Sequence, residues 1–105
     1  MKKYLRAKMA LLVLASMSGA AAGQGQAAIE AGEELFAEHC SPCHGDNLRS
    51  SGAAFDLREL RAGERARFDR GVMEGKGQMP PWRGVLGNGE LDQLWTYIRA
   101  HANDR

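Results

Sequence analysis

The chain has 105 residues and carries 14 Lys+Arg against 13 Asp+Glu, so its formal charge is +1. A chain of this length holds one small domain. Without the basic N-terminal segment described next, 10 basic residues remain against 13 acidic ones, and the resulting charge of −3 does not suggest nucleic-acid binding.

Residues 1–22 have the organisation of a secretory signal peptide. An apolar stretch at 9–17 is shorter than the roughly 20 residues that span a bilayer, which favours export with cleavage over a retained membrane anchor. Small residues at 20–22 predict cleavage after Ala22, and Ala27 offers a second site. We therefore expect an exported domain at 23–105, with its core at about 29–102. The basic residues ahead of the apolar stretch are Lys2, Lys3, Arg6 and Lys8.

A helix is predicted over residues 29–39, after a loose leader at 23–28. Gly32 is informative because a glycine inside a helix costs about 1 kcal/mol relative to alanine. We expect it to let another helix cross at close range beside Phe36. The apolar stripe of this helix consists of Ile29, Gly32, Leu35 and Phe36.

The next five residues read Cys-Ser-Pro-Cys-His and contain both cysteines of the chain. Two thiols separated by two residues can each add to one vinyl group of a porphyrin, and the residue that follows then lies beneath the iron. The pattern predicts one covalently attached haem c held by Cys40 and Cys43, with His44 as the proximal iron ligand.

Three other uses of this motif are weaker. A thioredoxin-like dithiol protein needs a strand before the motif and a βαβ scaffold around it, and no strand-like run lies upstream. A zinc site needs four ligands, usually from two such pairs, and a second pair is missing. A disulfide between the two cysteines would close a loop too short to stabilise much.

A polar loop at 45–54 leads to Phe55 and Leu57, which we expect to pack near the edge of the macrocycle. The next predicted helix covers residues 63–74, with Phe68 and Val72 on its apolar face. Gly75 is a suitable C-terminal stop for it.

Residues 75–82 hold two glycines and two prolines, which forbid regular structure. Met79 precedes the first proline, so the loop holds its thioether in a fixed position, and we predict that it is the distal iron ligand. The usual role of a methionine is to fill gaps in a core, and we assign that role to Met73. His101 near a helix end and His39 beside the attachment turn are predicted to be surface residues instead of ligands.

The last predicted helix, at 89–102 and capped by Gly87 or Asn88, has the clearest amphipathic pattern in the chain. We expect it to pack against the stripe that carries Gly32 and Phe36. No repeats or strand-forming runs are evident. The apolar positions of this last helix are Leu91, Leu94, Trp95 and Ile98.

From about residue 31 to residue 102 the chain resembles class I c-type cytochromes: a first helix with Gly32 and Phe36, the attachment motif, a Met-Pro-Pro-Trp loop and a final helix with Leu94 and Tyr97. The resemblance implies an all-α fold of three or more helices wrapped around one haem. It also implies an electron-transfer protein, not an enzyme, that passes single electrons between periplasmic redox enzymes.

The Phe-Asp-Leu-Arg run at 55–58 and the Met79 loop are similar to cytochromes that accept electrons from quinoprotein (PQQ-dependent) alcohol dehydrogenases. This similarity implies a dehydrogenase as donor and a terminal oxidase as acceptor, with transient docking of a monomer at the haem edge. Lys76 is the only lysine left after cleavage, so docking would rely on arginines, on apolar contact or on an oppositely charged patch of the partner. We expect Trp82 to pack on the haem or bond a propionate. A haem-based sensor or peroxidase-like protein is the alternative, and it needs the open sixth position that Met79 would fill.

Overall fold

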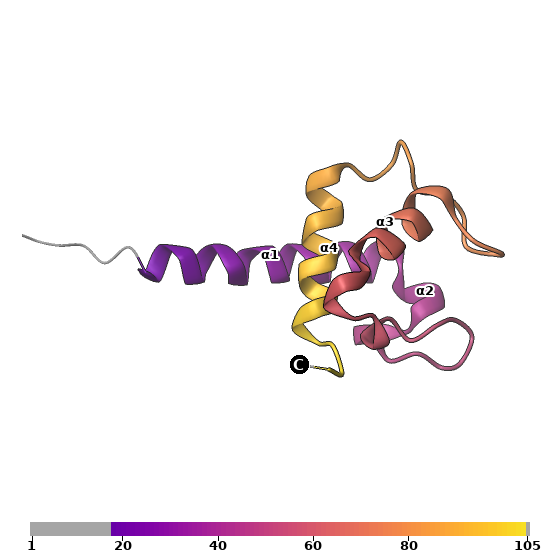
Figure 1. The fold of residues 1–105 in the computed structure, drawn as a ribbon, viewed down its shortest axis with the longest axis horizontal. Coiled ribbons are helices and arrows are strands. Elements are labelled where there is room, and N and C mark those ends of the chain that lie inside the picture. The colour runs from indigo at the N-terminus through magenta and orange to yellow at the C-terminus, as the bar shows by residue number, and fades with distance from the viewer. Residues whose placement is uncertain (1–17, 105) are drawn as a thin grey trace, which may run out of the picture.

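The computed structural model describes residues 18–104, with side chains described from residue 23 onward (Figure 1). Four α-helices follow one another along the described residues, and no strand lies among them, which confirms the all-α prediction. Within this range no helix is both long and apolar enough to cross a bilayer. The helices are α1 (Ser18–His39), α2 (Ser41–His44), α3 (Arg65–Glu74) and α4 (Asn88–Ala100), with short 3-10 helices η1 (Asp46–Leu48), η2 (Leu57–Glu59) and η3 (Ala62–Glu64) between α2 and α3.

The crossing of α1 and α4 is the main packing contact of the fold (Figure 1). Gly32 is buried there, and a Cβ atom on it would lie 2.7 Å from the Cβ of Tyr97 and would also strike the Gln93 carbonyl. One turn later, the rings of Phe36 and Tyr97 pack with their centroids 5.6 Å apart. The predicted close crossing at Gly32 is therefore confirmed.

The hydrophobic core extends from this crossing to α3. The rings of Phe68 and Trp95 join α3 to α4 with a centroid separation of 5.3 Å. Leu48 of η1 also belongs to this core and is 1% exposed. The side chains below 2% exposure are Phe36, Leu48, Leu94 and Ile98.

The observed α1 begins at Ser18, eleven residues before the predicted start at 29. The loose leader predicted at 23–28 is wrong, because these residues continue the helix. Alanine and glutamine have high helix propensity, and a helix already formed extends at little cost beyond its docked half. Figure 1 shows this half of α1 projecting past α4. The basic and apolar parts of the predicted signal peptide, at 1–17, lie outside the described residues.

Glycines define the ends of the two later helices, as predicted. Gly75 ends α3 with φ +78°, and its N–H donates to the Gly71 carbonyl. Gly87 precedes α4, and its N–H donates to Glu90 Oε1 at 2.9 Å. The start of α3 differs from the prediction by two residues, because η3 forms at Ala62–Glu64 and α3 follows at Arg65.

Candidate haem site

The last four residues of the Cys-Ser-Pro-Cys-His run form α2, a single helical turn that Cys40 alone separates from the end of α1. The Cys40 N–H still donates to the Phe36 carbonyl of α1 at 2.9 Å. The Cys40 carbonyl then accepts from Cys43 at 3.2 Å and from His44 at 3.0 Å. This turn places the two thiols and the imidazole one after another on a short, hydrogen-bonded backbone.

Both cysteines are free thiols, and Cys40 is half-buried whereas Cys43 is exposed. Burial raises the pKa of the Cys40 thiol to about 11, and the charge of a Cys43 thiolate adds to the effect. At neutral pH Cys40 is therefore a thiol. Dithiol redox proteins need the opposite, an attacking thiolate with a lowered pKa.

The His44 ring is oriented by a backbone carbonyl eleven residues further on. Its Nδ1 lies 3.3 Å from the Phe55 carbonyl oxygen. Because a carbonyl oxygen can only accept, Nδ1 carries the proton and donates, which leaves the lone pair on Nε2 free for a metal. Ligating histidines are commonly fixed by this kind of outer contact.

The Phe55 carbonyl is itself held by the turn that follows it. Asp56 Oδ1 accepts from the backbone N–H of Arg58 at 3.0 Å, which caps η2. The Arg58 guanidinium also binds both carboxylate oxygens of Asp56, each at 3.0 Å. Sequence reasoning identified this run but gave no reason to expect that its backbone would reach His44.

Met79 lies in a tight turn that follows α3. Lys76 and Met79 exchange two backbone hydrogen bonds, of 3.1 and 3.0 Å, across a turn in which Gly77 has φ +61°. Gly75 lies against the far side of this turn: a Cβ on it would be 2.6 Å from the Met79 carbonyl oxygen. The Met79 side chain is half-buried beside the core.

Trp82 contacts both α1 and α3. Its N–H donates to the Val72 carbonyl of α3 at 2.8 Å. Its ring packs edge-on against the His39 ring, with centroids 5.1 Å apart. His39 was predicted to be a surface residue, and its side chain is 22% exposed, so it lies only partly at the surface. No sequence signal links two rings 43 positions apart.

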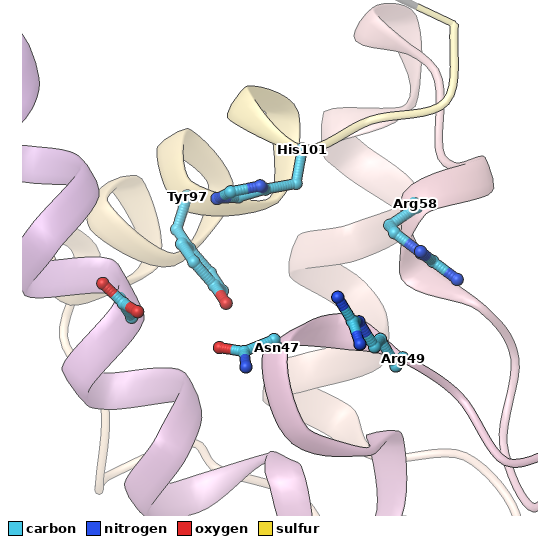
Figure 2. A pocket seen from close by; sticks show the side chains of 6 residues that line it. Asn47, Arg49, Arg58, Tyr97 and His101 are labelled. Carbon is cyan, nitrogen blue, oxygen red and sulfur yellow. The ribbon is translucent and has the colours of Figure 1, made fainter.

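The other candidate ligands lie where the sequence placed them. Met73 packs against the core, and His101 is exposed at the end of α4, with its ring 4.9 Å from that of Tyr97. A polar hollow of about 270 Å³ lies beside this pair. Figure 2 shows the side chains of Asn47, Arg49, Arg58, Tyr97 and His101 that line it. It contains none of the predicted haem-binding residues.

The donor set in these two segments suits a covalently bound haem. The attachment turn offers two unpaired thiols and an imidazole with its Nδ1 already engaged, and the loop after α3 offers a thioether. These groups match thioether formation and His/Met ligation. A zinc site is not supported, because residues 18–104 contain no group of three or more His, Cys, Asp or Glu side chains that could hold a metal.

Residues 27–98 match the family described as cytochrome c oxidase, cbb3-type, subunit III. The chain belongs to the cytochrome c family. It is 33% identical to cytochrome c6 of Euglena gracilis over 78 residues, which cover 68% of this chain and 90% of that protein. Proteins of this family bind haem c covalently, so the predicted cofactor and the predicted family are both confirmed.

Two larger proteins contain a similar region. A solved structure of quinohemoprotein alcohol dehydrogenase ADHIIG from Pseudomonas putida HK5 superposes with a TM-score of 0.68 at 32% identity, covering 75% of this chain and 12% of that one. The cbb3-type cytochrome c oxidase subunit FixPc of Rhizobium leguminosarum is 32% identical over 77 residues, which are 27% of its length. This cytochrome therefore corresponds to a small part of each of these proteins.

Proposed function

We propose that this protein is a one-electron carrier whose single haem c is attached through Cys40 and Cys43, with His44 and Met79 as the iron ligands. The observation that carries the proposal is the contact of His44 Nδ1 with the Phe55 carbonyl, directly after two free thiols on the same turn. Haem iron supplies the chemistry by taking up and releasing one electron, and His/Met ligation favours a raised reduction potential.

The polypeptide keeps its ligands in place while the charge of the site changes. The Phe55 carbonyl holds the tautomer and orientation of His44. The turn closed by Lys76 and the two prolines that follow restrict Met79, so its thioether stays in the same position. Trp82, placed between His39 and α3, would help to hold the haem by packing on it or by bonding a propionate.

A ligand-binding sensor or a peroxidase needs a vacant sixth position and, for peroxidase chemistry, a distal acid-base group. Met79 fills that position under this proposal. Of the two other histidines that the structure describes, His39 packs against Trp82 and His101 lies at the exposed end of α4. This arrangement supports a carrier over either alternative.

We place the carrier in the periplasm, after cleavage of residues 1–22, as a monomer. Its donor is a dehydrogenase, a PQQ-dependent alcohol dehydrogenase being the specific candidate, and its acceptor is a terminal oxidase. Support comes from the relatives, since similar regions occur in a quinohemoprotein alcohol dehydrogenase and in a cbb3-type oxidase subunit.

The test compares Met79→Ala with Met73→Ala in protein expressed with c-type maturation machinery. We expect covalent haem in the wild type and in both variants, measured as pyridine haemochrome. The ferric low-spin spectrum with its methionine-to-iron charge-transfer band should be lost in Met79→Ala alone, because Met73 packs in the core.

Wild-type protein without covalent haem would refute the proposed attachment. A wild-type ferric haem that is high-spin and binds added ligands readily would favour the sensor or peroxidase alternative. Loss of the charge-transfer band in Met73→Ala, with Met79→Ala unchanged, would show that the distal ligand is Met73 and would refute the assignment to Met79.

A further inference from the structure

The contact between His39 and Trp82 joins the attachment turn to the methionine loop. His39 is the last residue of α1 and immediately precedes Cys40. Its ring meets that of Trp82 at an interplanar angle of 62°, the edge-to-face geometry that aromatic rings favour. The carboxylate of Glu38 also lies 3.8 Å from His39, but it is 72% exposed, and such surface pairs contribute little.

The backbone of Trp82 is held from two sides. Its N–H donates to Val72 in α3, and its carbonyl accepts from Val85 at 2.9 Å and from Leu86 at 3.0 Å. The ring contact with His39 adds a third connection, to the end of α1. Trp82 therefore cannot shift without breaking hydrogen bonds or losing this ring contact.

Two prolines separate Trp82 from Met79. Proline fixes φ near −65°, so this short connection has little freedom to absorb a displacement. On the other side, the turn closed by Lys76 and Met79 limits movement as well. A change in the position of Trp82 is consequently passed on to the Met79 side chain.

We propose that His39 is a positioning residue for Met79. By packing against Trp82 it fixes the methionine loop to the end of α1 and so resists displacement of the thioether by other ligands. The inference rests on the proposed function, in which Met79 ligates the iron. His39 itself makes no bond to iron in this scheme.

The experiment measures imidazole binding to the ferric holoprotein, because imidazole competes with the sixth ligand. An edge-to-face ring pair predicts that His39→Ala binds imidazole about two- to tenfold more tightly than the wild type. His39→Phe keeps an aromatic ring against Trp82 and should return the dissociation constant to within about twofold of the wild type. His101→Ala is the matched control, since it removes a similar ring contact with Tyr97 at 4.9 Å, and it should have no effect.

A second measurement keeps the inference separate from general destabilisation. In a Trp82→Leu background, His39→Ala should no longer change imidazole affinity, because the partner ring is already gone. Equal imidazole affinity in wild type and His39→Ala, or an equal gain in His101→Ala, would overturn the positioning role while leaving the carrier proposal intact. Absence of the methionine-to-iron band in the wild type would instead overturn the proposed function, and this inference with it.

Discussion

Asp56 stabilises the backbone turn next to the His44 ring. Its carboxylate caps η2 and accepts hydrogen bonds from Nε and Nη2 of Arg58. The residue before it, Phe55, supplies the carbonyl that holds His44 Nδ1. The Asp56 cap therefore stabilises the local backbone from which the imidazole is oriented.

Asp56 gives a pH-dependent prediction. Hydrogen bonds and charge from Arg58 hold the pKa of the Asp56 carboxyl below its usual value of 3.8. A lowered folded-state pKa adds stability above the unfolded value, and this contribution is lost as the pH falls through the folded one. We expect Asp56→Asn to lower the free energy of unfolding by roughly 0.5 kcal/mol at neutral pH, since the ion pair is about one-third exposed.

Urea unfolding of wild type and variant, repeated from neutral pH to below pH 3.8, measures this difference. The two proteins should converge only in the acid range. Asp46→Asn is the control, because the described contacts include no hydrogen bond or ion pair of the Asp46 side chain. A wild-type advantage that persists unchanged below the folded-state pKa would contradict the assigned cause.

At the scale of elements, the crossing of α1 and α4 positions the attachment turn. The crossing is close because Gly32 has no side chain, and the last turn of α1 then leads from Phe36 to Cys40. A wider crossing would move the end of α1 and, with it, the His39 ring and both cysteines.

Gly32→Ala should therefore destabilise the protein, whereas Gly71→Ala should not. The new methyl at position 32 would overlap backbone and side-chain atoms of α4, at a cost of about 1–3 kcal/mol. A Cβ at Gly71 in α3 would meet no atom within 4 Å, so the gain in helix propensity should stabilise that variant by about 0.5–1 kcal/mol. Denaturant unfolding measures both, and equal stability of the two variants would contradict the close crossing.

At the scale of the whole molecule, the proposed site consists of two segments that lie far apart in the sequence. One follows α1, the other follows α3, and Trp82 connects them through contacts with both. The surface that a partner would meet carries few lysines, because Lys76 is the single lysine within residues 23–105. Arginines supply nearly all of its positive charge.

We expect the holoprotein to be reduced by a PQQ-dependent alcohol dehydrogenase when alcohol is added, followed as the change in the haem spectrum. If arginines guide docking, the second-order rate should fall as ionic strength rises, because salt screens exposed charges over about 10 Å at 0.1 M. A reaction without alcohol and chemical reduction with dithionite are the controls. Protein that dithionite reduces but the dehydrogenase does not would refute this choice of donor.

The parts of the site that the sequence predicts are those encoded locally. The attachment turn needs five consecutive residues, and the methionine loop is marked by its own glycines and prolines. The contacts of His44 with Phe55 and of His39 with Trp82 join residues 11 and 43 positions apart, and neither has a local pattern. The early start of α1 was missed because no apolar period marks residues before 29.

By itself, the sequence determined the cofactor motif, the all-α class, the helix that ends at Gly75 and the glycine at the helix crossing. Each depends on chemistry or backbone geometry that a few neighbouring residues specify. Only the tertiary structure decided which carbonyl orients His44 and which ring holds Trp82. Those contacts exist because packing brings distant segments together, and no local sequence pattern marks the residues that meet.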